Sequence, residues 1–306
     1  MSRSAPHRRD VLAASLSSAA VLATQSLVPA QEKTASIPLG FSLYGMKSLP
    51  VEEAIRICGE IGYDCVELPA MEGWPADGLK LGESALAKIN DARLAAEISV
   101  SAIMENLVLA VDDATHKLNL ARLAAAARVA KRLEAPLLET VLGGAPRQWE
   151  SLKTTMAQRL RDWSKLAADN KVRIAIKAHV GGAAHLPEHL LWLLEQVESD
   201  VLCIVYDPSH FHLRGLTLAE SSKPLAKHTQ FVHVKDARGT PEKPEFLLPG
   251  EGHIDLVALL RLLLSHHYAG SVVVEVSGQI SSRDGYNPIA IARNCFQTLR
   301  AAANEL

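Results

Sequence analysis

Short apolar segments alternate with longer amphipathic segments along this chain, from about residue 40 to the carboxyl terminus. The apolar segments have the length of buried parallel strands, and turn-forming residues bound them. Eight such segments occur, at 40–44, 64–68, 100–104, 136–142, 172–179, 201–206, 231–236 and 271–276. A helix-like segment follows each one, which predicts an α/β protein. The count and the length match a single (βα)8 barrel, the TIM barrel, over residues 37–306.

An open doubly wound sheet is the alternative α/β arrangement. Such sheets usually carry a glycine-rich phosphate-binding turn after the first strand. Here the first strand is followed by the sequence GMKS, which lacks that pattern. The barrel is therefore preferred. The segment after 231–236 is expected to be a long irregular loop that reaches Gly252.

The amino terminus is different in kind from the rest of the chain. Arg8 and Arg9 precede an apolar run rich in Ser and Ala over residues 13–28, and Pro29 and Ala30 follow. An export signal over 1–30 is predicted by the charged start, the short apolar run and the small residues that follow it as a cleavage site. The arginine pair resembles a twin-arginine signal. The expected location is the periplasm, with no membrane attachment after cleavage. A retained membrane anchor is the alternative.

Charge and cysteine content limit the partners. The net charge is −2 and the isoelectric point is about 6.6, whereas a nucleic-acid partner calls for a basic surface. The four cysteines show no CxxC spacing and are expected to be mainly core residues, with a disulfide between Cys58 and Cys295 left open. We expect a small molecule as the partner and no nucleic acid. A homo-oligomer is compatible with the sequence.

Three of the predicted strands end in residues that can bind metals. Asp207 follows the strand 201–206, while His233 and Glu275 lie near the ends of the last two strands. In a barrel these ends converge on one mouth. Carboxylate and imidazole groups together suit one divalent ion, either Mn, Co, Mg or Zn. His210, one turn past Asp207, is expected to bind that metal or a substrate hydroxyl.

Charged residues inside other apolar segments are also candidates. Lys177 lies within the sequence IAIKAH, where a lysine is costly unless it is paired or lines a cavity. Glu139 is similarly unexpected among Leu and Val, and it could be a metal ligand or a partner of Lys177. The remaining candidates for contact with substrate are Glu67, His179, Lys235 and Arg238.

The motifs DPSH, HVKD, PGEGHID and VVVEVSG, in this order, resemble the xylose isomerase-like barrel superfamily. That resemblance implies the (βα)8 fold and covers sugar isomerases, ketose 3-epimerases, inosose dehydratases and type IV apurinic endonucleases. It implies that Asp207, His233 and Glu275 bind a metal. Lys177 stands where the family commonly has a glutamate ligand. Three alternatives follow: Glu139 completes the metal site, Lys177 acts as acid or base, or its ammonium replaces the metal charge.

The resemblance implies a metal-dependent sugar isomerase or epimerase that works through an enediolate. Glu275 or Lys177 would remove the proton next to the carbonyl, and His210 would assist. The main alternative is a lyase that acts on an oxidised (3-keto) glycoside by β-elimination. A Schiff-base aldolase using Lys177 and a non-catalytic exported sugar-binding barrel are further alternatives, while an endonuclease is disfavoured.

Overall fold

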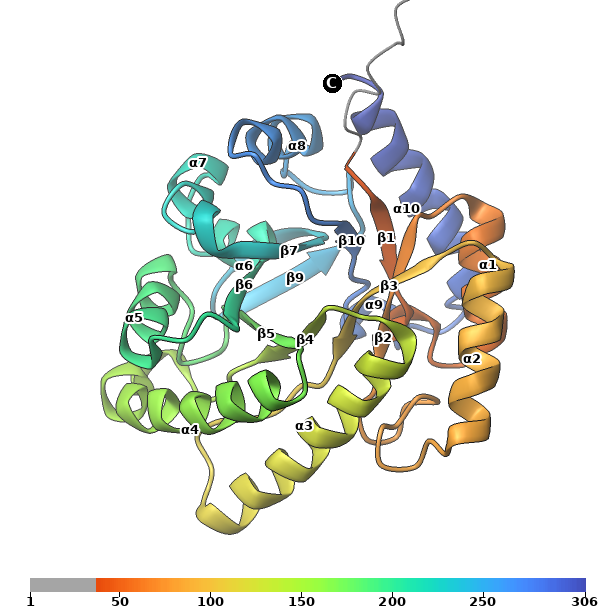
Figure 1. The fold of residues 1–306 in the computed structure, drawn as a ribbon. Coiled ribbons are helices and arrows are strands. Elements are labelled where there is room, and N and C mark those ends of the chain that lie inside the picture. Colours follow the sequence, from red (N-terminus) through yellow and green to blue (C-terminus); the bar gives the residue numbers. More distant parts are fainter. Residues whose placement is uncertain (1–36) are drawn as a thin grey trace, which may run out of the picture. The chain divides into compact units, whose positions relative to one another are not determined.

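The computed structural model describes residues 37–306, which form a closed barrel of eight parallel strands surrounded by helices (Figure 1). This confirms the predicted TIM barrel. Neighbouring strands follow the order β1-β10-β7-β6-β5-β4-β3-β2. The strands are β1 (Leu39–Ser42), β2 (Cys65–Pro69), β3 (Ser99–Met104), β4 (Leu137–Val141), β5 (Arg173–Lys177), β6 (Leu202–Tyr206), β7 (Thr229–Val234) and β10 (Val272–Val274).

The longer helices lie on the outside of the barrel, mostly where the amphipathic pattern predicts them (Figure 1). They are α1 (Val51–Ile61), α2 (Glu83–Ala95), α3 (Asp113–Leu133), α4 (Trp149–Asp169), α5 (Pro187–Val197), α8 (Leu256–Ser265) and α10 (Pro288–Ala303). Shorter helical segments are α6 (Pro208–His212), α7 (Leu218–Ser222), α9 (Gly278–Ser281), η1 (Leu43–Met46), η2 (Pro146–Gln148) and η3 (Ala226–His228). No helix within 37–306 has both the length and the apolar character needed to cross a bilayer.

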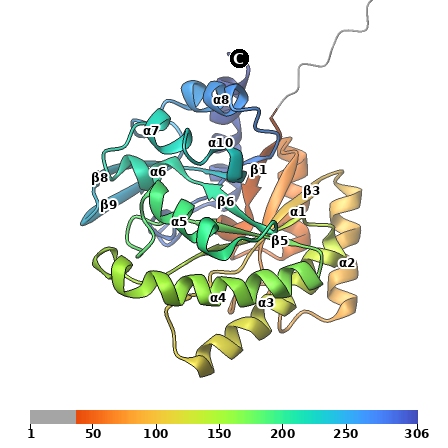
Figure 2. The ribbon, with the colours of Figure 1, turned by 60° about the vertical axis from the view of Figure 1, so that its left-hand side comes forward.

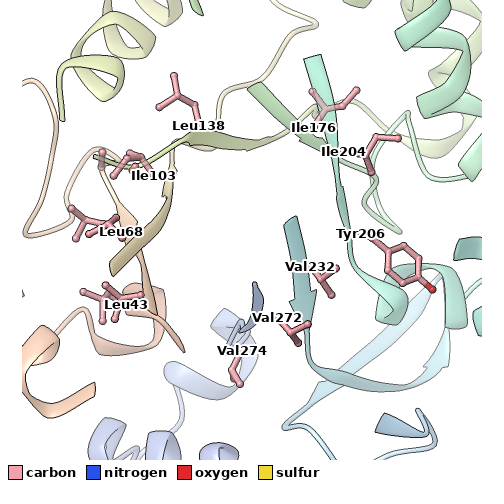
Figure 3. Close-up of a cluster of buried hydrophobic side chains, with 14 of the residues drawn as sticks. Leu43, Leu68, Ile103, Leu138, Ile176, Ile204, Tyr206, Val232, Val272 and Val274 are labelled. Carbon is pink, nitrogen blue, oxygen red and sulfur yellow. The ribbon is translucent and has the colours of Figure 1, made fainter. Parts of the chain in front are cut away.

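Alternation along the strands divides the buried residues into two groups. In β4, Leu138 belongs to the large core between strands and helices, and Figure 3 shows it among the side chains that line this outer layer. Its neighbour Leu137 belongs instead to the small core inside the barrel. Side chains alternate with a period of two, so Glu139 also faces the barrel interior, one layer above Leu137. The same spacing relates Ala175 to Lys177.

The loop after β7 differs from the prediction. Instead of an irregular loop, it begins with an antiparallel hairpin made of β8 (Asp236–Thr240) and β9 (Lys243–Leu247). Strand β8 contacts α6, and Figure 2 shows the hairpin at the edge of the barrel. The hairpin extends the wall at the carboxyl ends of the strands, which is the face where barrels carry their sites.

Two other expectations concern the cysteines and the amino terminus. All four cysteines are free and buried, so Cys58 and Cys295 form no disulfide. The expected export signal over 1–30 lies outside the described residues.

Candidate functional site

A buried cluster of charged side chains fills the carboxyl end of the barrel. At its centre is Lys177, the last residue of β5, whose side chain is 2% exposed. Its Nζ lies 2.8 Å from Glu275 Oε1, 2.9 Å from His233 Nδ1 and 3.2 Å from Glu139 Oε1. An ammonium has three N–H donors, and these three groups surround it. Burial opposes the charge, but Glu139 and Glu275 outweigh this effect and raise the pKa of Lys177.

Lys235 is the second cation of the cluster. Its Nζ donates to Asp207 Oδ2 and to Glu275 Oε2, so the Glu275 carboxylate is held between two ammonium groups. Burial favours the neutral acid at Asp207, but Lys235 outweighs it and the pKa of Asp207 falls below its usual range. In the same way, burial would raise the pKa of Glu275, but Lys177 and Lys235 hold it well below its usual range. Both acids are therefore carboxylates at neutral pH.

Asp207 is also fixed by the helix that follows it. It is the N-cap of α6, and its Oδ1 accepts hydrogen bonds from the backbone N–H of Ser209 at 3.2 Å and from Ser209 Oγ at 2.6 Å. Capping residues of this kind satisfy the free N–H groups at the start of a helix. The local sequence Asp-Pro-Ser thus fixes one carboxylate oxygen and leaves the other for Lys235.

Partners on both sides fix the orientation of His233. Its Nε2 lies 3.0 Å from Glu67 Oε2, and its Nδ1 lies 2.9 Å from Lys177 Nζ. A carboxylate only accepts hydrogen bonds and an ammonium only donates them. His233 therefore carries its proton on Nε2, and its Nδ1 lone pair accepts from Lys177. Glu67 supports this imidazole from below and is not part of the cavity wall.

His179 and His210 both line the cavity, and Nε2 of His210 lies 3.4 Å from Asp207 Oδ2. Nδ1 of His179 accepts from the backbone N–H of Gly181 at 3.1 Å, and Nδ1 of His210 accepts from that of Val180 at 3.3 Å. Each neutral ring therefore carries its proton on Nε2. Burial lowers the pKa of His179 to about 4 and that of His210 well below its usual value, so both rings are neutral at neutral pH.

Glu139 is the least satisfied member of the cluster. Its side chain is completely buried, and neither carboxylate oxygen has a hydrogen bond of good geometry. Burial raises its pKa to about 7, against the opposing effect of Lys177. It lies beneath Lys177 and does not reach the cavity wall, so it balances charge inside the barrel.

A cavity of about 400 Å³ opens above this cluster. Four of the expected site residues besides Glu275 line it: Lys177, His179, His210 and Lys235. Its other walls were not predicted from the sequence and comprise Tyr44, Asn106, Val141, Gly143, Gly144, Gly181, Gly182, Phe246, Ser277 and Gly278. Most of these follow strand ends, and that position is the one signal that could have indicated them.

Arg238 lies apart from the expected site residues that meet at this cavity. It is on β8, more than half exposed, and makes two hydrogen bonds of 2.7 Å to Glu245 across the hairpin. Asp236 at the start of the same hairpin has a structural role. Its Oδ1 accepts hydrogen bonds from the backbone N–H groups of Ala237, His253 and Ile254. It therefore fastens the loop 247–254 to the end of β7.

Three residues of the cluster have the composition of a metal site. Ligand atoms of Asp207, His233 and Glu275 lie within 4.8 Å of one another, so a single ion could reach all three. The expected fourth ligand, Glu139, is not among them. The donor types suit a divalent ion. However, Lys177 and Lys235 already donate to these same three residues, so the residues present do not fit a resident metal.

Several solved structures share this fold. One is 3-keto-D-glucoside 4-epimerase, YcjR, from E. coli, with 15% identity and a TM-score of 0.70, covering 87% of this chain and 99% of that one. Another is the IolI protein, whose structure contains a zinc atom, with 20% identity and a TM-score of 0.72, covering 88% of this chain and 97% of that one. At these identities the likeness demonstrates a shared fold.

Sequence comparison gives a more specific relationship. An inosose dehydratase from Clostridium botulinum is 24% identical over 188 residues, which is 56% of this chain. The match spans 61% of the length of that relative. The family model described as xylose isomerase-like TIM barrel matches residues 55–300, which is most of the chain. The chain therefore belongs to the family of xylose isomerase-like TIM barrels.

Proposed function

We propose that this protein is an enzyme that removes a proton next to the carbonyl of a keto-sugar or keto-cyclitol, and that β-elimination follows. The position of Glu275 carries the proposal. Among the cavity-lining residues of the described chain it is the one carboxylate, and an ammonium group lies on each side of it. A base beside fixed positive charge is what enolate formation requires.

The cations and the imidazoles have separate roles in this proposal. Lys177 and Lys235 both reach the cavity and are the donors for the substrate carbonyl oxygen. Negative charge develops on that oxygen as the proton leaves, and a nearby ammonium stabilises it. His179 donates from Nε2 to a substrate hydroxyl group, whereas Nε2 of His210 lies 3.4 Å from Asp207 Oδ2.

The proton and electron balance is that of a simple elimination. The C–H bond breaks, its proton moves to a Glu275 oxygen, and its electron pair forms the enolate. The carbonyl then re-forms as a C=C bond is made and the C–O bond at the β carbon breaks. The leaving oxygen takes up the proton held by Glu275 and departs as water or an alcohol. No oxidant or reductant is consumed.

Substrate binding has to raise the basicity of Glu275. A carboxylate paired with two ammonium groups is a weak base, because both cations favour its charged form. A carbonyl oxygen that accepts from Lys177 or Lys235 takes over part of one of these pairings. The proposal therefore couples substrate binding to the activation of the base.

The inosose dehydratase relatives support elimination, since dehydration is a β-elimination of water. From the sequence, isomerisation or epimerisation was the leading expectation. Here it is the second candidate function, and the fold shared with the 3-keto-D-glucoside 4-epimerase supports it. Epimerisation by two opposed bases needs a second base at the cavity. Glu139 is buried below it, and Lys177 is held as an ammonium by its carboxylate neighbours, so one-base chemistry fits the site better.

The test is turnover of a panel of inososes, keto-sugars and 3-keto-glycosides, with products identified by NMR. We expect loss of water or of the aglycone from at least one member. Glu275→Gln should lower that rate by about 10²–10⁴-fold, as removal of a general base does. The matched control is Glu195→Gln, an exposed residue on α5. A Glu275→Gln variant that turns over as fast as the native protein would falsify the role of this residue.

The place of action is a separate proposal. We infer from residues 1–30 that the protein is exported by the twin-arginine route and meets glycosides outside the cytoplasm. Cell fractionation tests this inference. A mature protein lacking residues 1–30 in the periplasmic fraction supports it, and full-length protein in the cytoplasm contradicts it.

A further inference from the structure

We propose that the ammonium groups of Lys177 and Lys235 take the place of a divalent cation in this site, so that the protein works without a bound metal. The catalytic part of this statement rests on the proposed function. The binding part does not, because it can be measured without any substrate.

The first argument is the number of lone pairs available. A neutral imidazole has one free lone pair, and that of His233 lies on Nδ1, because Nε2 donates to Glu67. Lys177 Nζ lies 2.9 Å from Nδ1 and takes this lone pair. A transition metal binds an imidazole nitrogen at about 2.0–2.1 Å and needs the same lone pair. His233 can therefore bind Lys177 or a metal, but not both.

The second argument concerns the two carboxylates. Both oxygens of Glu275 accept from an ammonium group, since Lys177 Nζ donates to Oε1 and Lys235 Nζ donates to Oε2. Asp207 Oδ2 is held by Lys235, and Asp207 Oδ1 caps α6. Each of the three candidate ligands is therefore engaged by an ammonium at the atom that faces its neighbours.

The third argument is that buried neighbours fix the position of the Lys177 ammonium. Its side chain is buried at the end of β5, and the Glu139 carboxylate lies beneath it without another hydrogen-bond partner of good geometry. Moving the ammonium away would take from Glu139 its ion-pair partner at 3.2 Å, and Glu139 would then have to bind a proton to remain buried. The pairing with Glu139 therefore favours Lys177 at the centre of the cluster.

The charges are equivalent as well. Two ammonium groups supply the same +2 as one divalent ion, next to the same three side chains and at the floor of the same cavity. They also supply N–H donors, which can hydrogen-bond the substrate oxygen while the proton is transferred. In the proposed reaction, the charge that stabilises the enolate oxygen thus comes from the protein's own side chains.

The experiment measures metal content. Native protein and a Lys177→Glu variant are incubated with Mn²⁺, Co²⁺ or Zn²⁺, freed of unbound metal by gel filtration, and analysed for metal per chain. The native protein should hold no stoichiometric metal. Lys177→Glu removes the competing cation and adds a carboxylate beside Asp207, His233 and Glu275. It should hold about one ion per chain and gain thermal stability on metal addition, as ligand binding to the folded state requires.

Lys165→Glu is the matched control, because it makes the same charge change on the exposed face of α4. It should bind no more metal than the native protein. Stoichiometric metal in the native protein would overturn the proposal, even if Lys177→Glu fails to fold. A folded Lys177→Glu variant that takes up no more metal than Lys165→Glu would also contradict it. Absence of turnover on every substrate would count against the proposed function and leave the metal result standing.

Discussion

At the scale of single residues, tautomers and charge pairs decide what this site can do. Lys177 and Lys235 can only donate, and Glu67 can only accept. These fixed roles set His233 as an acceptor toward Lys177, while backbone N–H groups leave the ring proton of His179 and of His210 on Nε2. The cavity floor therefore offers one base, Glu275, among several donors. This arrangement suits an oxygen-rich substrate that develops negative charge.

The depressed pKa of His179 predicts a pH dependence of stability. Burial, with a contribution from Lys177 and Lys235, lowers the pKa from 6.5 to about 4 in the folded protein. Between these values the unfolded chain binds a proton that the folded chain does not. The stabilising contribution is thus fully present above about pH 6.5 and is lost as the pH falls toward 4.

Urea unfolding at several pH values checks this prediction. Between about pH 6.5 and pH 5, the native protein should lose roughly 1–2 kcal/mol more than a His179→Gln variant, since each pKa unit corresponds to about 1.4 kcal/mol. His253→Gln, at an exposed position, is the control and should follow the native protein. Identical pH profiles for native protein and His179→Gln would contradict the account.

At the scale of elements, the segment after β7 builds one wall of the cavity and depends on one buried carboxylate. Asp236 Oδ1 accepts from three backbone N–H groups, at 3.0 Å from Ala237 and His253 and at 3.2 Å from Ile254. Gly252 passes so close that a Cβ there would lie 2.2 Å from this oxygen. The side chain thus ties the hairpin β8–β9 and the following loop to the barrel.

Replacing Asp236 by Ala should cost about 3 kcal/mol of unfolding free energy, because three backbone N–H groups, two of them buried, lose their acceptor. Asp236→Asn retains an oxygen at the same position and should stay much closer to the native protein. Urea unfolding measures both variants. If Ala and Asn have equal effects, the hydrogen bonds of Oδ1 are not what holds this loop.

The hairpin β8–β9 was not predicted from the sequence. It contains Gly239 and Pro244 and its tip is exposed, so it lacks the apolar alternation that reveals a strand. A helix was expected over about 217–227, and the structure has the five-residue α7 there. The barrel strands were predictable because they are buried on both faces and form continuous apolar runs.

At the scale of the whole molecule, the barrel separates stability from chemistry along its axis. Its interior holds apolar side chains such as Leu137 and Phe231 in the lower layer, and charged side chains at the carboxyl ends of the strands. Strand-end position was enough to predict that Asp207, His233 and Glu275 lie close together. The contacts of Lys177 with His233 and Glu275 were not predictable, because they depend on distances between β5, β7 and β10.

The central claim is that the protein's own cations and Glu275 enolise a keto substrate. Its most direct measurement is exchange of the hydrogen next to the carbonyl in D₂O, followed by NMR with an excess of chelator present. The account predicts exchange by the native protein that the chelator does not reduce and that Glu275→Gln removes. Exchange that disappears with the chelator and returns with added metal, or that survives Glu275→Gln, would contradict it.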